Sequence, residues 1–138
     1  MDIINQIEAF RLGAPFSDIA LLIARIIMGT TFFYYGKYKL RDLKQNAKDF
    51  DEIHGFKPGW LWGTIVALLE GVGSILLLLG ILAPLMAFGF VVHMTLGFLW
   101  KTTKTDKPFT DWSYDLLALG VALLLLVAGP GAYTVNLF

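Results

Sequence analysis

Residues 60–80 read WLWGTIVALLEGVGSILLLLG and contain a single charged side chain, Glu70. An apolar run of this length is enough for an α-helix that crosses the hydrocarbon core of a bilayer. On either side of it, three further runs carry few charges: residues 18–36, 84–100 and 112–129. The sequence therefore predicts an all-α, polytopic membrane protein, a four-transmembrane-helix bundle formed by one domain over residues 1–138.

The amino-acid composition agrees with a membrane protein and argues against other classes. Of the 138 residues, 57% are hydrophobic and 16% are charged, with 11 basic residues balancing 11 acidic ones. A nucleic-acid partner is not expected from a chain without net positive charge. The absence of cysteine removes disulfides, thiolate metal sites and iron–sulfur clusters. No haem or other metal site is expected, because His54 belongs to a loop and His93 is the only histidine within a predicted span.

Lysine and arginine are distributed unevenly between the two sides of the predicted bundle. The segments 37–57 and 101–107 hold nine of them, whereas the opposite side offers only Arg11. Because basic loops stay in the cytoplasm, this asymmetry predicts cytoplasmic basic loops and places both the N and the C terminus outside. Tryptophans at the cytoplasmic ends of the spans, which favour the headgroup layer, agree with the predicted boundaries.

Two segments outside the spans have helical periodicity. In the cytoplasmic segment 37–57, Lys37, Arg41, Lys44 and Lys48 recur at steps of three and four residues beside an apolar row, as in a basic amphipathic helix. Its charges serve either to set topology and bind anionic lipid, or to dock a soluble partner. Residues 1–12 are predicted to form a short helix on the membrane surface.

Three ionisable residues fall near the centres of the predicted spans: Arg25, Glu70 and His93. On insertion scales a lone central charge costs roughly 2.5–3.5 kcal/mol, so two opposite charges are expected to pair. The sequence therefore predicts an ion pair between Arg25 and Glu70, with His93 beside it. This group has two interpretations: interhelical polar contacts that only hold the bundle together, or a polar cavity that binds or protonates a ligand.

Small and aromatic residues accompany the three ionisable ones. Gly29 and Gly36, on the stripe of Arg25, and Gly89 and Gly97, on the stripe of His93, predict close helix contacts. The surrounding aromatic residues would suit a flat ring with polar oxygens, such as a quinone headgroup, although the same residues are also typical of core or lipid contacts. These aromatic residues are Phe32, Phe33, Tyr34, Tyr35, Phe88, Phe90, Phe98 and Tyr114.

Short motifs spread over nearly the whole chain resemble the DoxX family of small four-helix membrane proteins. They comprise Arg25 and Gly29, the run Tyr35-Gly36-Lys37-Tyr38-Lys39-Leu40, then Glu70, Gly73 and Gly80. The ending Gly129-Pro130-Gly131-Ala132-Tyr133-Thr134-Val135-Asn136 is similar to the family's Gly-x-Gly-Arg-Tyr-Ser-Leu-Asp. Ala132 and Asn136 depart from this pattern, which has Arg and Asp at those positions, so a role for that pair of charges does not transfer.

The resemblance implies a bacterial or archaeal inner-membrane protein that acts as a quinone- or quinol-linked accessory subunit of an oxidoreductase system. On this hypothesis a quinone is the cofactor, and Arg25, Gly29, Tyr35, Lys39, Glu70 and His93 are the binding residues. Arg25 would donate to a quinone oxygen, Glu70 would orient Arg25, and His93 or Glu70 would exchange the proton. A redox partner is expected at the cytoplasmic face, and the bundle is either a monomer or a homodimer.

The alternative is a non-enzymatic membrane scaffold or small transporter. In that case the buried ion pair is structural, and the basic cytoplasmic helix recruits a protein.

Overall fold

The computed structural model describes residues 2–10, 13 and 15–135 of the chain. All regular elements in this part are helical. In chain order they are α1 (Ile3–Ala9), α2 (Phe16–Arg41), α3 (Leu43–Asp49), η1 (Phe50–His54), α4 (Gly59–Leu68), η2 (Leu69–Gly73), α5 (Ser74–Leu79), α6 (Ala83–Lys104) and α7 (Phe109–Ala128). The two elements η1 and η2 are short π-helical turns.

Four helices are long and apolar enough to cross a membrane, which confirms the predicted fold class. They are α2, the continuous helix Gly59–Leu79 made of α4, η2 and α5, and the helices α6 and α7. Two of them extend further than the hydropathy pattern indicated, since α2 continues past Gly36 to Arg41 and α6 continues past Trp100 to Lys104. Both extensions carry lysines that were expected in loops but lie on helices.

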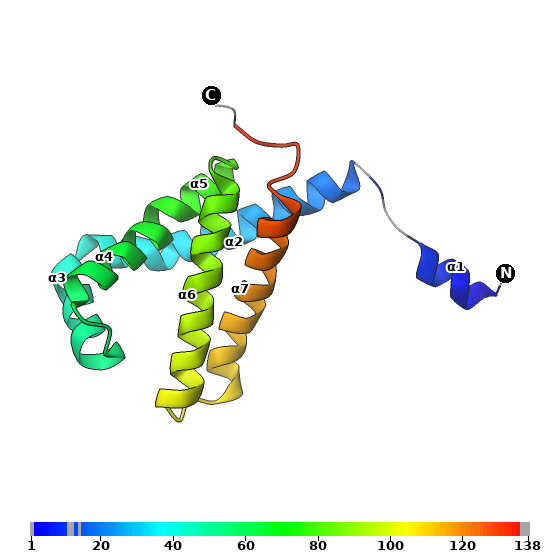
Figure 1. Ribbon diagram of the computed structural model, residues 1–138. Helices are drawn as coiled ribbons and strands as arrows, with labels where there is room; N and C mark the ends of the chain where they lie inside the picture. Colours follow the sequence, from blue (N-terminus) through cyan, green and yellow to red (C-terminus); the bar gives the residue numbers. More distant parts are fainter. Residues whose placement is uncertain (1, 11–12, 14, 136–138) are drawn as a thin grey trace.

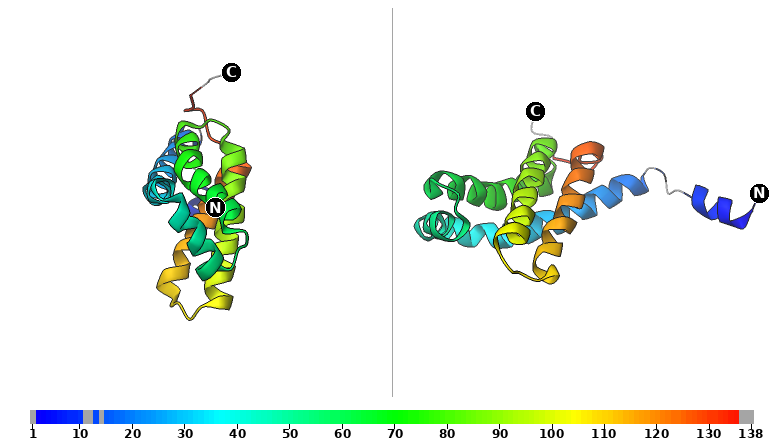
Figure 2. Two further views of the ribbon diagram at one scale, coloured as in Figure 1. Left: turned by 90° about the vertical axis from the view of Figure 1, so that its left-hand side faces the viewer. Right: turned by 60° about the horizontal axis from the view of Figure 1, so that its bottom comes forward.

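The four long helices are arranged as two pairs. Helix α2 packs along α4, η2 and α5, and α6 packs along α7, and Figures 1 and 2 show the two pairs crossing each other. Residues 79–83 and 129–135 lie at one end, which we call the closed end. Residues 42–58 and 104–109 lie at the other, the open end, where the two pairs diverge (Figure 1).

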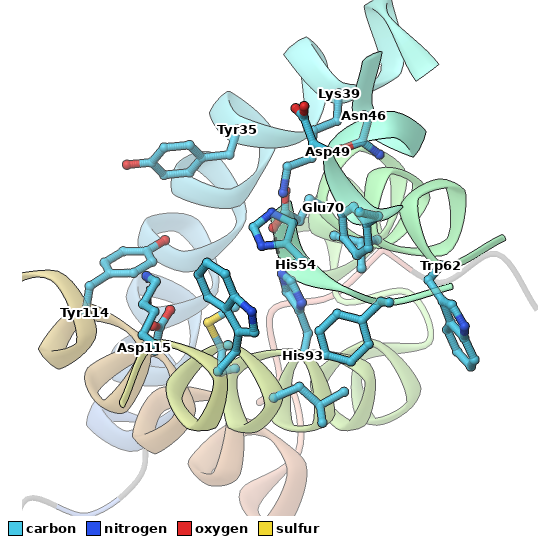
Figure 3. Close-up of a pocket in the computed structure, with 18 of the residues that line it drawn as sticks. Tyr35, Lys39, Asn46, Asp49, His54, Trp62, Glu70, His93, Tyr114 and Asp115 are labelled. Atoms are coloured by element: carbon cyan, nitrogen blue, oxygen red, sulfur yellow. Dashed lines mark hydrogen bonds and ion pairs between the residues drawn. The ribbon is translucent and has the colours of Figure 1, made fainter. Parts of the chain in front are cut away.

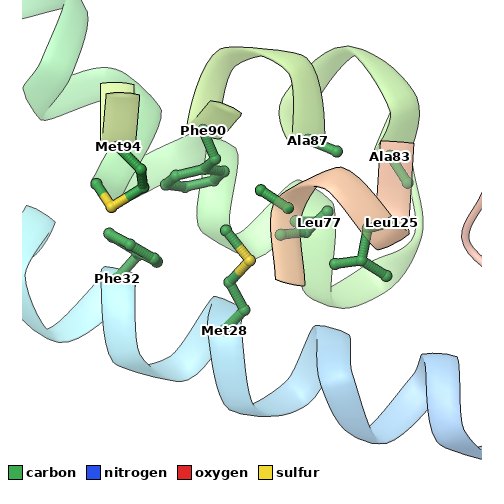
Figure 4. Packing of buried hydrophobic residues seen from close by; sticks show 9 residues of the cluster. Met28, Phe32, Leu77, Ala83, Ala87, Phe90, Met94 and Leu125 are labelled. Carbon is green, nitrogen blue, oxygen red and sulfur yellow. The ribbon is translucent and has the colours of Figure 1, made fainter. Parts of the chain in front are cut away.

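The apolar core lies where the pairs cross. Met28 and Phe32 of α2 meet Leu77 of α5, Phe90 of α6 and Leu125 of α7, all nearly fully buried (Figure 4). The Phe32 and Phe90 rings have centroids 4.6 Å apart. Small residues of α6 and α7 complete the core, as expected for helices that must approach closely in lipid.

The first pair is held together by a glycine contact. Gly36 of α2 lies so close to η2 that a Cβ atom there would overlap the backbone of Glu70 and Gly71. This contact coincides with the π-helical turn, and π-turns inside helices commonly mark functional positions. The turn carries Glu70, so the close approach of the two backbones fixes where this carboxylate sits.

The basic segment 37–57 does not form one continuous amphipathic helix. The chain turns at Asp42, whose carboxylate accepts a hydrogen bond from Gln45 N at 3.0 Å and so caps α3. Helix α3 then packs against α4, where the buried Asn46 side chain donates to Gly63 O at 2.7 Å. Because of this packing, α3 forms a wall at the open end, while Arg41, Lys44 and Lys48 remain exposed.

At the N-terminus, α1 stands apart from the rest of the chain (Figure 1). Its side chains Ile3, Ile4 and Ile7 are exposed, as is Phe10 just after it. The apolar residues therefore lack partners in the described part of the chain, which agrees with a helix that contacts lipid.

The contact at Gly36 gives a stability prediction. We expect Gly36→Ala to force α2 and η2 apart and to lower the free energy of unfolding by about 1–3 kcal/mol, the usual effect of overpacking. Thermal unfolding of the purified protein in detergent measures this change. Gly120→Ala is the matched control, because a Cβ there meets nothing within 4 Å. Equal melting temperatures for the two variants would contradict the close contact.

Candidate functional site

A cavity of about 830 Å³ lies between the two helix pairs and extends to the open end. Its walls come from the ends of α2 and α6, from α3, η1 and α4, and from the start of α7 (Figure 3). Aromatic side chains surround it, and two of its carboxylates are buried and ion-paired. One group of ionisable side chains is centred on Glu70 and another on Asp115.

Glu70 is the centre of the first group. Its carboxylate is only 5% exposed and is paired twice: Oε2 lies 2.6 Å from Lys39 Nζ, and Oε1 lies 2.6 Å from His93 Nε2. Because an ionised carboxylate only accepts hydrogen bonds, Nε2 of His93 carries the proton in this arrangement. Lys39 and His93 keep part of their surface exposed, at 31% and 19%, so both can also contact a molecule in the cavity.

Three elements bring this group together. The extension of α2 beyond Gly36 supplies Lys39, the π-turn η2 supplies Glu70, and α6 supplies His93. Lys39 reaches inward along its aliphatic stem, as lysines near helix ends do. The group therefore links the first helix pair to the second through charge as well as packing.

The predicted ion pair between Arg25 and Glu70 does not form, and that prediction is wrong. Arg25 is fully buried at the closed end and does not line the cavity. Its Nη1 donates to Leu78 O at 2.9 Å, and its Nη2 donates to Tyr133 O in the segment after α7. Backbone carbonyls are strong acceptors, so they satisfy a buried guanidinium without a carboxylate.

Gly29 also lies away from the cavity. A Cβ atom at this position would be 2.8 Å from Ser74 O and 2.9 Å from the Leu78 Cβ. Its role is therefore close packing of α2 against α5. Of the six residues in the predicted binding set, the structure places Tyr35, Lys39, Glu70 and His93 on the cavity wall.

The second group was not identified from the sequence. Asp115 of α7 is 4% exposed, and its Oδ2 lies 2.9 Å from Lys101 Nζ of α6. Next to it, the hydroxyl of Tyr114 is enclosed and has no hydrogen-bond partner among the described residues. The available signal was a carboxylate on the small-residue face of the last span, but its partner Lys101 had been assigned to a loop.

An aromatic contact joins the two helix pairs at the open end. The His54 ring of η1 lies edge-on to the Trp100 ring of α6, with centroids 4.7 Å apart. Burial, followed by the nearby Lys39 cation, lowers the pKa of His54, so the imidazole is neutral at pH 7. A histidine assigned to a loop is thus part of the cavity wall.

The sequence profile of the DoxX family matches residues 20–102, more than half of the chain. The chain belongs to the DoxX family. No curated protein and no solved structure matches it. The matched residues include Arg25, Lys39, Glu70 and His93, whereas Lys101 is near the end of the match and Asp115 lies beyond it.

The end of this DoxX protein packs back onto the closed end. Val135 N donates to Leu79 O at 2.9 Å, and Ala132 N donates to Asp18 Oδ1 at 3.0 Å. Together with the bond from Arg25 to Tyr133 O, these contacts fasten residues 131–135 over the ends of α2 and α5. Ala132, which departs from the family ending, contributes its backbone here, and Asn136 lies outside the described residues.

Arg25 should therefore stabilise the ending. We expect Arg25→Met to leave Leu78 and Tyr133 carbonyls without their donor and to lower the free energy of unfolding by about 1–3 kcal/mol. Amide hydrogen exchange of Val135 should accelerate, because its bond to Leu79 O would no longer be held in place. Arg41→Met, at the exposed open end, is the control. Unchanged exchange at Val135 in the Arg25 variant would show that Arg25 does not hold the ending.

Proposed function

We propose that this DoxX protein is a quinone- or quinol-linked accessory subunit of an oxidoreductase system, with the quinone ring bound in the cavity beside Glu70 and His93. The observation that carries the proposal is a cavity of about 830 Å³ whose aromatic walls surround a buried carboxylate paired with an imidazole. Its volume is in the range of small-molecule and cofactor sites, which are mostly apolar with a few convergent polar groups.

The residues on the wall fit the chemistry of a quinone. A bound quinone supplies two-electron, two-proton redox chemistry. Lys39, whose ammonium group has three hydrogens, can donate a hydrogen bond to an oxygen in the cavity while it keeps Glu70 as its counter-charge. The one Nε2–H of His93 is given to Glu70, and its imidazole lies beside that oxygen. The imidazole and the carboxylate, 2.6 Å apart, can hold or pass on a proton released at that oxygen.

This assignment changes the role that the sequence suggested for Arg25. Arg25 donates to backbone carbonyls at the closed end, so Lys39 rather than Arg25 donates to the quinone oxygen. Glu70 then orients Lys39 and His93 rather than Arg25. The positive charge at the site comes from a side chain that reaches the cavity from the open end.

We assign the electron-transfer partner to the open end. The chain has no cysteine, so it offers no thiol couple, and a soluble partner protein would supply or accept the electrons. The exposed cations of α2 and α3 form a basic surface there that suits an acidic partner. On the same proposal the protein lies in the inner membrane as a monomer or a homodimer, with its open end in the cytoplasm and its termini outside.

Quinone binding is the first test. Duroquinone, tetramethyl-1,4-benzoquinone, should quench the tryptophan fluorescence of the purified protein, since Trp62 and Trp100 line the cavity. We expect Glu70→Gln and His93→Asn each to weaken binding roughly tenfold, the effect of losing a hydrogen bond to a charged group.

Two control variants make this test specific. Thr95→Val, on α6 but outside the cavity wall, and Arg25→Met, at the closed end, should bind duroquinone like the unaltered protein. Absence of binding, or equal affinity in all variants, would contradict the quinone site and favour the scaffold or transporter.

The orientation can be tested with single cysteines. Val135→Cys lies at the closed end and Thr103→Cys at the open end of α6, and the natural chain has no thiol that would interfere. In intact cells we expect a membrane-impermeant maleimide to label Val135→Cys directly and Thr103→Cys only after lysis. The reverse labelling pattern would show that the basic loops face outward.

A further inference from the structure

The cavity has a second polar wall that the proposed function does not use. Lys101 Nζ bridges two acceptors of α7, Asp115 Oδ2 at 2.9 Å and Asp111 O at 3.3 Å. The Tyr114 hydroxyl beside them has no partner among the described residues. In Figure 3, Tyr114 and Asp115 lie at the left of the residues drawn, and Glu70 and His93 lie near the middle.

The two walls differ in the number of basic side chains beside each carboxylate. Glu70 lies at ion-pair distance from two, Lys39 and His93. At the second wall, Asp115 has a single cation and Tyr114 has an unused hydroxyl. Enclosed polar groups without partners are uncommon in folded proteins and are often completed by a ligand or water. The second wall therefore has free capacity to bind a polar atom.

The distance between the walls follows from the helix that they share. His93, Gly97 and Lys101 recur every four residues on α6, so successive members are about 6 Å apart along its axis. The Asp115 carboxylate lies beside Gly97, with Oδ1 3.6 Å from the position of a Cβ there. The second group therefore begins roughly one helical turn from His93, and Lys101 is two turns, about 12 Å, from His93 along the axis. A six-membered ring with oxygens on opposite carbons that is hydrogen-bonded at both ends needs roughly this longer separation.

Gly97 keeps the space between the two groups open. Its missing side chain would point toward Asp115, whose carboxylate supplies the three atoms nearest to that position, at 3.6–3.9 Å. Gly97 faces Asp115 of α7, in agreement with the helix contact predicted from the sequence, and it also lines the cavity. Met94, nearly fully buried one turn away, provides an apolar surface beside this gap.

From this arrangement we propose that Lys101, Tyr114 and Asp115 form a second subsite, which holds the distal oxygen of a ligand whose proximal oxygen lies at His93. The ligand class is then a flat ring with two opposed oxygens, a para-quinone or its quinol. This inference rests on the proposed function and narrows it, since a ligand with one oxygen would leave the second subsite empty.

The test compares two ligands that differ by one oxygen. Tetramethylhydroquinone has two opposed hydroxyls, and 2,3,5,6-tetramethylphenol lacks one of them. Calorimetric titration under anaerobic conditions gives the affinity of each for the full chain in nanodiscs. We expect the unaltered protein to prefer the hydroquinone by roughly tenfold or more, the effect of one added hydrogen bond to a charged group.

Two variants remove the second subsite with little disturbance of the fold. Tyr114→Phe deletes only the hydroxyl. The double variant Lys101→Met with Asp115→Asn removes both charges together, so neither is left buried alone. In both variants we expect the ratio of the hydroquinone affinity to the phenol affinity to fall, and in the double variant to approach one. The affinity for the phenol should stay unchanged. Thr102→Val, exposed on α6, is the control that keeps the full preference.

A variant at Gly97 tests the space itself. Gly97→Leu should fill the gap between the two groups and weaken binding of both compounds at least tenfold, and its melting temperature is measured beside that of the unaltered protein. If the variants at the second wall keep the full preference, or if Gly97→Leu binds normally, the second subsite is wrong although a quinone site at Glu70 stands. If neither compound nor duroquinone binds the unaltered protein, the proposed function fails and this inference fails with it.

Discussion

The buried carboxylate of Glu70 is the group on which the arrangement of the helices depends. A charge inside a membrane helix needs partners close by, and those partners must come from neighbouring elements. Lys39 from the end of α2 and His93 from α6 meet this requirement, so the first helix pair is tied to the second. The pairs diverge beyond this point, and the cavity lies between them. The pairing of the Glu70 carboxylate with Lys39 and His93 therefore determines where the candidate site lies.

The same physical requirement is met differently at the closed end. Arg25 is as deeply buried as Glu70, yet its acceptors are the carbonyls of Leu78 and Tyr133. Carbonyls become available where a helix ends or the chain is irregular, because the regular hydrogen bonds stop there. The two buried charges therefore have separate roles, since Arg25 fastens the end of the chain whereas Glu70 faces a cavity that a ligand can occupy.

The fold class could be predicted because apolar length is a property of consecutive residues. The partners of the buried charges were harder to predict for two physical reasons. The acceptors of Arg25 are backbone atoms, which leave no trace in a pattern of side-chain charges. Lys101 was assigned to a loop by its charge, although α6 continues past the apolar run and turns this lysine toward Asp115. Lys39 entered the predicted site only through the resemblance to DoxX proteins, not through its position. The positions of Glu70 and His93 near the centres of their predicted spans were enough to predict that these two side chains lie together.

The central claim is that the space between the two helix pairs is a quinone site. Photo-crosslinking with an azido-substituted benzoquinone, followed by peptide mass spectrometry, tests it most directly. If a quinone binds there, adducts form on cavity residues from both pairs, within 35–39 and 93–101, and excess duroquinone suppresses them. Adducts confined to the exposed outer surface of α7, at Leu117 and Val127, or adducts that duroquinone does not suppress, would contradict it.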